Sequence, residues 1–423
     1  MTFRGRSTAR SFRHRNYRLF YGGQLVSLIG TWMQTVAQSW LVLTLTGNPF
    51  DLGLVAAAQF VPVLFLGLFG GVIADALPKR RTLIAAQAVM MSLAFVLWAV
   101  TAAGVVTVPM IIAIALLLGC ANAVDMPVRQ SFVVEMVGRE DVANAVALNS
   151  AMFNAARIIG PAVAGITIAV VGIAPAFLLN GLSFVAVIVA LLAMRDVELR
   201  QVERGPTPRS AGAVLDNLVE GLRYVRRTPL VLLPILVVGG VSAAGMNFSV
   251  IFPAFVRDDL GGGAAGYGLL MAAFGVGSLV AALHLAARGR ARPWAIVGGA
   301  LLLGIAEIAM APVRILGVAA ALGFVAGYGA ITMAANGNST IQVSVPDALR
   351  GRVMSVYTTV FVGSTPVGGL AAGALASTIG VSATIAVGGA ISVAIALAAA
   401  AWLRASGAAS RRASVAAAGP REV

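Results

Sequence analysis

Long apolar runs alternate with short polar segments along nearly the whole 423-residue chain. An α-helix needs about 20 apolar residues to cross the roughly 30 Å hydrocarbon core of a bilayer. Runs of this length lie near residues 17–46, 50–74, 82–104, 107–131, 142–170, 172–194, 229–256, 264–287, 293–311, 313–342, 351–379 and 380–404. The pattern therefore predicts an all-α polytopic membrane protein with twelve transmembrane helices.

A polar, arginine-rich stretch divides the twelve runs into two sets of six. The expected order is a basic tail (1–16), a first six-helix bundle (17–194), a cytoplasmic linker (195–228), a second six-helix bundle (229–404) and a C-terminal tail (405–423). Apolar residues recur at helical spacing within residues 213–227 of the linker. This spacing predicts an amphipathic helix at the membrane surface.

The two halves of the sequence also resemble each other. Two pairs of segments align, residues 51–71 with 266–286 and residues 141–161 with 347–366. The first alignment places Gly53 opposite Gly268, and basic residues follow both segments. Many transporters consist of two related halves around a site near the membrane midplane. The repeats therefore predict two bundles related by pseudo-symmetry.

Composition and charge narrow the class of protein. With 59% hydrophobic and 11% charged residues, the chain is far from the roughly one quarter of charged residues typical of soluble domains. Its net charge of +14 would suit nucleic acid, but all of its basic residues except Arg157, Arg257 and Arg314 fall on one side of the predicted topology. This bias follows the positive-inside rule. It predicts a multi-pass protein of a bacterial cytoplasmic membrane, with both termini in the cytoplasm and no nucleic-acid partner.

The sequence shows no catalytic constellation. A Walker loop, zinc-type histidine spacing and a serine elbow with a plausible base are missing. Cys120 is the only cysteine, so an intrachain disulfide is excluded and nothing suggests a cysteine-based metal site. We therefore expect no enzyme activity, no cofactor and no metal site.

A charged hinge interrupts the apolar pattern between the second and third runs. It contains Gly71, Asp75, Lys79, Arg80 and Arg81. A glycine permits close approach of helices, a carboxylate can accept hydrogen bonds from the amides of a helix N-terminus, and the cations anchor the turn at a membrane surface. The hinge resembles the loop signature of the major facilitator superfamily.

Three further stretches resemble the same superfamily. The fifth run carries Gly160 and Pro161 in a segment similar to the glycine-proline motif of its antiporters. Residues 122–130 and 346–353 are similar to its branch of macrolide-type drug pumps and the enterobactin exporter. Glycine and proline also remove side-chain bulk and one backbone hydrogen bond, so the same motif is compatible with a tight, bent helix crossing alone.

The resemblance covers essentially the whole chain and implies a function. It implies a secondary active transporter that exports amphipathic organic compounds, of drug or siderophore type, by proton antiport with alternating access. An importer or facilitator of a small organic solute on the same fold is one alternative, and a non-transporting membrane receptor is another. The expected partners are the lipid bilayer, a small-molecule substrate and protons. We expect a monomer, because each half can bury its polar face against the other.

The charges near the cytoplasmic surface suggest a gate. We expect Asp75 to meet the N-terminus of the eleventh helix, near Arg350 and Arg352, when the cytoplasmic side is closed. Lys79 is expected to meet Asp125 in a similar way. The alternative interpretation makes all of these residues ordinary solvated charges at the membrane interface.

Polar residues spaced three and four apart mark helix faces that avoid lipid. The longest such stripe lies on the first run and extends about 21 Å at roughly 1.5 Å per residue. The stripes together predict a central cavity lined by Gln24, Ser27, Thr31, Gln34, Gln38, Asn122, Asn154, Arg157, Tyr328, Thr332 and Asn336. Interhelical hydrogen bonds without a cavity are the alternative.

Three charged residues lie within the apolar runs away from their very ends. Arg157 is deep in the fifth run, where an unpaired cation costs roughly 3 kcal/mol or more. Its depth argues against Asp125 as partner, and an anionic group on the substrate is a further possibility. Asp125 and Glu307 are the candidates for proton coupling, since a buried acid can load and release a proton. For Glu307 the favoured interpretation is an acid that reaches the outer surface.

Overall fold

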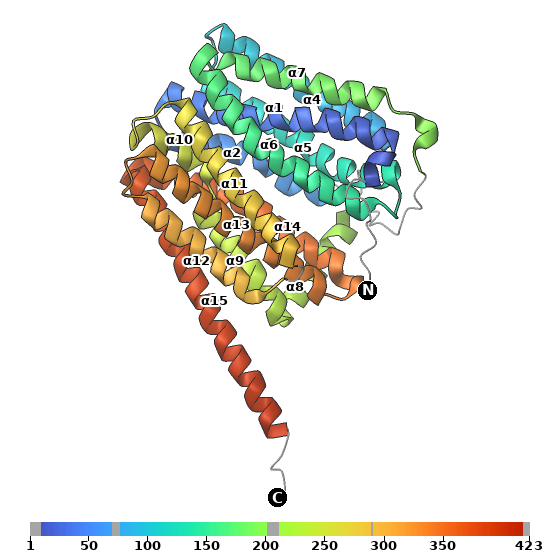
Figure 1. The fold of residues 1–423 in the computed structure, drawn as a ribbon, viewed down its shortest axis with the longest axis vertical. Helices are drawn as coiled ribbons and strands as arrows, with labels where there is room; N and C mark the ends of the chain where they lie inside the picture. Colours follow the sequence, from blue (N-terminus) through green and yellow to red (C-terminus); the bar gives the residue numbers. More distant parts are fainter. Residues whose placement is uncertain (1–9, 70–76, 201–210, 289–290, 418–423) are drawn as a thin grey trace, which may run out of the picture.

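The computed structural model describes residues 10–69, 77–200, 211–288 and 291–417, and its regular structure is helical throughout these ranges (Figure 1). The first part of the chain forms η1 (Arg10–Arg13), α1 (Arg15–Thr46), α2 (Pro49–Leu66), η2 (Gly67–Phe69), α4 (Lys79–Ala102), α5 (Val108–Val137), α6 (Val142–Val171), α7 (Ala174–Leu192) and η3 (Asp196–Glu198). The second part forms α8 (Ala211–Arg227), α9 (Pro229–Gly245), α10 (Phe248–Asp258), α11 (Ala264–Arg288), α12 (Pro293–Met310), α13 (Leu316–Ser344), α14 (Asp347–Ile379) and α15 (Val381–Ala417).

Eleven segments of the described chain are long and apolar enough to cross a membrane. One of them, Pro229–Asp258, combines α9 and α10. Helix α1 is the twelfth. It is 32 residues long, but its row of glutamines makes it more polar than the other spans. The prediction of twelve transmembrane helices is therefore confirmed.

The helices form two bundles, which Figure 1 shows in blue to green and in yellow to red. Helices α1, α2 and α4 to α7 pack together in the first bundle, and α9 to α15 pack together in the second. The linker helix α8 packs against α14. An ion pair of 2.6 Å between Arg352 of α14 and Glu220 of α8 fixes this contact. The amphipathic helix expected in the linker is therefore attached to the second bundle.

The two bundles meet where glycines replace side chains. On one side, α2 packs against α14, and a Cβ added at Gly53 would overlap the carbonyl oxygen of Gly369. On the other side, α6 packs against α11, and a Cβ at Gly268 would lie 2.5 Å from the carbonyl oxygen of Pro161. Small residues let membrane helices approach backbone to backbone. Gly53 and Gly268, which the repeats align, thus make equivalent contacts in the two halves.

A cluster of charged residues marks one end of the molecule. At the end that we call the basic end, Asp141 before α6 accepts contacts from the N-terminal segment: Arg13 and His14 lie at 2.8 Å and Arg10 at 3.1 Å. The hydrogen bond with His14, aided by the charges of Arg13 and Arg10, holds the pKa of Asp141 below its usual value despite burial. We call these four residues the tail cluster. It fixes the N-terminal segment to the first bundle.

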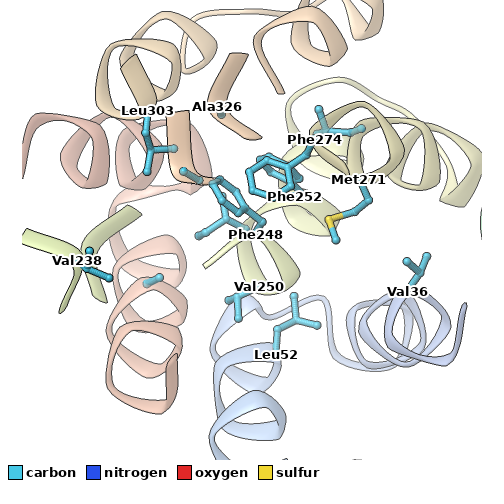
Figure 2. Packing of buried hydrophobic residues seen from close by; sticks show 14 of the residues in the cluster. Val36, Leu52, Val238, Phe248, Val250, Phe252, Met271, Phe274, Leu303 and Ala326 are labelled. Atoms are coloured by element: carbon cyan, nitrogen blue, oxygen red, sulfur yellow. The ribbon is translucent and has the colours of Figure 1, made fainter. Parts of the chain in front are cut away.

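The seventh span is broken in the middle. Helix α9 ends at Gly245, α10 begins at Phe248, and Met246 and Asn247 lie between them. Just beyond the break, Phe248 and Phe252 of α10 pack against Phe274 of α11 (Figure 2), with ring centroids of the two pairs 4.3 and 6.3 Å apart. The break redirects the chain, and this aromatic cluster holds the second segment in place.

Candidate functional site

The first bundle encloses a polar cavity of about 60 Å³ between α1, α2, α4, α5 and α7. Its polar lining consists of Gln24, Ser27, Thr31, Gln34, Thr35, Gln38, Gln59, Gln87, Asn122, Asp125, Arg129 and Asn180. The whole stripe predicted on the first helix therefore faces one cavity. It does so because residues three and four apart share one face of a helix, and the close packing of α1 on α6 and α7 turns that face inward.

Two polar contacts organise the cavity. Asp125 lies 3.3 Å from the guanidinium of Arg129, one turn along α5, and accepts a hydrogen bond of 2.8 Å from the amide of Gln87. On the other side, the amide of Asn180 donates to Gln34 at 2.5 Å. Buried charges persist in membrane proteins when they are paired and hydrogen-bonded, as Asp125 is here.

Two acceptors in the cavity are left without a protein partner. The side-chain oxygens of Gln24 and Gln87 are buried and accept no hydrogen bond within the described protein. Leaving a buried acceptor unpaired is unfavourable, so these oxygens are available to water or to donor groups of a ligand. At about 60 Å³ the cavity has room for only a few waters, whereas pockets for drug-sized ligands exceed about 300 Å³. A larger cargo requires the cavity to widen.

Several predicted cavity residues lie elsewhere. The Tyr328 hydroxyl is 2.6 Å from the His284 ring, Asn336 accepts from the backbone amide of Arg292, and both contacts lie within the second bundle. Together with Thr332, these α13 residues do not line the cavity of the first bundle. Asn154 donates to a carbonyl of its own helix and is likewise absent from that lining. For these positions the alternative of hydrogen bonds between or along helices describes the structure better.

Arg157 bridges the two bundles. Its guanidinium donates to the hydroxyl of Ser278 on α11 and lies 5.0 Å from the centre of the Phe274 ring. No carboxylate within the described ranges forms an ion pair with it. A guanidinium over an aromatic face is stabilised by the ring quadrupole. The partner that sequence could not identify is therefore a hydroxyl and a ring of the opposite bundle.

Three cavity residues escaped the sequence prediction. Gln59 on α2 and Gln87 on α4 each stand alone among apolar neighbours, and Asn180 on α7 has only Ser183 as a polar neighbour one turn away. A single amide in an apolar run is a weak signal. The only signal is the free-energy cost of exposing such an amide to hydrocarbon, which indicates that it faces protein or water.

The predicted gate residues have the following contacts. Gly71 and Asp75 lie outside the described residues. Lys79 does not meet Asp125: it pairs at 2.5 Å with Glu135, because Asp125 lies more than two turns deeper along α5. Arg80 pairs at 2.5 Å with Asp196 of η3 and donates to the carbonyl of Leu191, which joins α4 to the end of α7.

The remaining gate residues contact their own bundles. Arg81 is exposed. Arg350 pairs with Asp347 at 2.5 Å and donates to the carbonyl of Gln342. Arg352 pairs with Glu220, as described above. In this conformation the two arginines are thus held within the second bundle and its linker helix.

Gly160 and Pro161 lie at two different contacts. A Cβ at Gly160 would lie 2.5 Å from the Cβ of Trp32 on α1, inside the first bundle. The carbonyl of Pro161 faces Gly268 in the second bundle. The motif therefore supports both a tight crossing within one bundle and a contact between the two.

The expectation that Glu307 reaches the outer surface is wrong. Glu307 is only 4% exposed and borders a second, smaller cavity inside the second bundle. Its helix turns the side chain toward α9, α10 and α15 rather than toward lipid or water. The sequence gives the position of Glu307 along its span, but this position does not reveal the direction in which the side chain points.

Comparison with known proteins agrees with this architecture. The family described as "Transmembrane secretion effector" matches residues 6–420. The multidrug efflux pump Tap of Mycolicibacterium fortuitum is 31% identical over 371 residues, covering 84% of this chain and 88% of the pump. The enterobactin exporter EntS of Shigella boydii serotype 18 is 25% identical over 357 residues, covering 82% and 81%.

A solved structure shares the fold. The crystal structure of the nucleoside transporter NupG superimposes with a TM-score of 0.68, covering 92% of this chain and 98% of that one, at 14% sequence identity. Similarity at this level concerns the fold alone. From the family match, the relatives and the twelve-helix architecture together, the chain belongs to the transmembrane secretion effectors of the major facilitator superfamily, and it is a membrane-embedded efflux or secretion transporter rather than an enzyme.

Proposed function

We propose that this protein exports amphipathic organic molecules, of drug or siderophore type, from the bacterial cytoplasm by proton antiport. The observation that carries the proposal is the polar cavity of the first bundle, where the α1 stripe, Asn122 and the Asp125–Arg129 pair converge. Its unpaired acceptors, Gln24 and Gln87, suit cargo with hydrogen-bond donors. Relatives described as a multidrug efflux pump and an enterobactin exporter support this cargo class.

Transport proceeds by alternating access in this proposal. The glycine contacts between the bundles serve as the pivot, and rocking about them widens the small cavity toward one side at a time. The excess of arginine at the basic end supports a cytoplasmic location of that end and of both termini. One chain is sufficient, because it supplies both bundles.

The gate and the coupling acids complete the proposal. Asp75, at the hinge, is proposed to meet the N-terminus of α14 when the basic end closes, with Arg350 and Arg352 then exchanging their present partners. Asp125 and Glu307 are the candidate acids for proton coupling. Asp125 already has a cationic neighbour in Arg129, which distinguishes it from Glu307.

Uptake of a fluorescent dye panel into energised inverted vesicles tests this function. Export predicts uncoupler-sensitive accumulation that falls in Asn180→Ala, because this variant removes the amide that orients Gln34. The matched control is Ser377→Ala, at an exposed position of α14 far along the chain from the cavity. Accumulation only in right-side-out vesicles would instead establish an importer, and equilibration of the dye without accumulation, indifferent to the uncoupler, would establish a facilitator.

A further inference from the structure

The second bundle buries a carboxyl group that has no counter-ion. Glu307 on α12 is 4% exposed, its Oε2 atom has no hydrogen-bond partner in the described chain, and no Lys, Arg or His of the described ranges forms an ion pair with it. A carboxylate taken out of water without a partner is strongly disfavoured, and in practice such a group becomes neutral by binding a proton. Glu307 differs in this from Asp125, which has both an arginine and an amide.

The surroundings of Glu307 offer acceptors rather than donors. The hydroxyls of Thr384 and Ser392 on α15 donate to carbonyls of their own helix, at 2.8 and 2.9 Å. Asn247 donates to the carbonyl of Ala243 at 2.8 Å. The two hydroxyl hydrogens are therefore already used, and the Asn247 amide keeps one free N–H, so a carboxylate at this position gains little from its neighbours. A protonated carboxyl, in contrast, can donate to a free hydroxyl lone pair.

A cavity of about 20 Å³ adjoins the carboxyl group. A volume of roughly 10–15 Å³ is enough for one water molecule, so the cavity holds one water-sized particle next to Glu307. The space exists because residue 245 is glycine: a Cβ there would lie 2.8 Å from both Glu307 Oε2 and Ser392 Oγ. The cavity is thus large enough for a water molecule that could pass a proton to Glu307, and it is too small for an organic cargo.

The cavity lies at the break of the seventh span. Gly245 ends α9, Phe248 begins α10, and Asn247 between them lines the cavity. Broken helices in secondary transporters mark the sites of coupling ions, because the interrupted backbone can rearrange and its polar groups are exposed there. The break and the buried acid are independent observations that point to the same place.

We propose that Glu307 and the α9–α10 break form a proton-binding site in the second bundle, separate from the cargo cavity of the first. The proposal deepens the proposed antiport and rests on it for its physiological role. Binding adds one proton to a carboxylate oxygen and releases nothing else. Apart from Glu307 itself, the described residues that line the cavity carry no charge: those of α9, α10, α14 and α15 present apolar or neutral polar side chains.

Contacts lead from this site to the first bundle. Phe248 and Phe252 line the cavity and pack against Phe274, whose ring lies below the guanidinium of Arg157. A change at the break that accompanies proton release would therefore move residues in contact with α6. By this route, proton binding in the second bundle would be coupled to the first bundle through Arg157, near the middle of α6.

Infrared spectroscopy of the purified full-length protein in lipid vesicles tests the site without any cargo. We expect the wild type to show the carbonyl stretch of a protonated carboxylic acid near neutral pH, and Glu307→Gln to lose it. Gly245→Ala, which fills the cavity, should shift the band, whereas Gly298→Ala, at an open position of the same helix α12, should leave it unchanged. An identical band in wild type and Glu307→Gln would overturn the proposal. Removal of the band by sodium ions at constant pH would overturn it as well, because the site would then bind a metal cation.

Dye transport separates this proposal from the proposed function. With a dye that the wild type accumulates, Glu307→Gln should lose accumulation driven by a pH gradient but keep exchange of dye across the membrane without a gradient. Retained exchange also shows that the variant is folded. If the wild type moves no dye, the proposed cargo class fails while the infrared result still decides the proton site. Gradient-driven accumulation undiminished in Glu307→Gln would contradict the site directly.

Discussion

The guanidinium of Arg257 donates to the carbonyl oxygen of Leu43 at 2.8 Å, so a cation of the second bundle caps the C-terminal end of α1 in the first. It also donates to the carbonyl of Gly47 at 2.9 Å. The last carbonyls of a helix have no partner within the helix and carry partial negative charge. Arg257 therefore holds the two bundles together at the end opposite the tail cluster.

Replacing Arg257 by alanine should favour separation of the bundles at this end. Hydrogen bonds from a charged donor contribute about 1–2 kcal/mol where the site is partly exposed, so the opening equilibrium should shift by roughly tenfold. Spin labels at Asn48→Cys and Ser377→Cys, in a Cys120→Ser background, would report the distance between the bundles. We expect a larger population at long distance in Arg257→Ala.

The matched control for this experiment is Arg314→Ala. Arg314 lies at the same end, but it contacts Asp259 at 3.4 Å and Ser382 at 3.3 Å, both in its own bundle. Its removal should leave the distance distribution unchanged. If both variants shift the distribution equally, the effect would arise from lost surface charge rather than from the helix cap.

The glycine contacts between the bundles predict sensitivity to a single methyl group. In Gly268→Ala the added Cβ would lie 2.5 Å from the carbonyl oxygen of Pro161, and backbone atoms cannot withdraw as a flexible side chain can. We expect a loss of transport with little change in the yield of folded protein, since the clash lies between bundles rather than within one. Gly22→Ala, at an open position of α1, should transport normally. Normal transport by Gly268→Ala would show that the bundles are not tightly joined there.

The pair of Asp125 and Arg129 predicts a strongly non-additive double-mutant cycle. Asp125→Asn leaves the partly buried Arg129 without its counter-ion, which typically costs about 3 kcal/mol or more. Removing both charges in Asp125→Asn with Arg129→Gln should restore much of the thermal stability in detergent. Dye transport by the double variant should stay low, because the cavity has lost its charged groups. Additive losses of stability would mean that the two side chains do not depend on each other.

The tail cluster predicts release of the N-terminal segment in acid. Because the folded-state pKa of Asp141 lies below its ordinary value of 3.8, the ionised form stabilises docking at all higher pH values, and this contribution is lost as the pH falls below about 4. Cleavage of the N-terminal segment by pepsin, which acts in acid, should therefore increase below this pH. Asp141→Asn should show increased trypsin cleavage after Arg10 and Arg13 at neutral pH.

The neighbouring acid provides a control for the tail cluster. Glu140 lies 3.8 Å from Arg13 but is 73% exposed, and exposed ion pairs contribute little. Glu140→Gln should resist trypsin as the wild type does. Equal cleavage of both variants would indicate a general effect of charge on the N-terminal segment.

Sequence predicted the fold well because hydrocarbon imposes simple rules. A chain that crosses a bilayer must satisfy its backbone within helices, so run length gave the spans, and only the α9–α10 break was missed within them. The alignment of Gly53 with Gly268 even anticipated two equivalent helix contacts. The length of an apolar run does not reveal a two-residue interruption of the helix such as Met246 and Asn247.

The candidate site was predicted in part. The α1 stripe was found because five polar residues repeat on one face. Gln87 was missed because it stands alone in its run, and Asn180 was missed because Ser183 is its only polar neighbour one turn away. The residues of the α13 stripe form hydrogen bonds within the second bundle in this structure. Sequence could not distinguish this arrangement from a cavity, because both require the same polar spacing. For Glu307, sequence gave the depth but not the direction of the side chain, which depends on how α12 is rotated in its bundle.

The equivalent glycine contacts of the two bundles bear on how the two bundles come to have different functional roles. Because the close glycine contacts match on both sides, the interface treats the two halves alike, and a difference in their roles must come from what each half encloses. One half encloses a network of amides with a compensated ion pair, and the other encloses a solitary acid among phenylalanines. Exchanging a cavity side chain between corresponding positions of the two halves would then move a functional role from one bundle to the other, and it would not simply destabilise the fold.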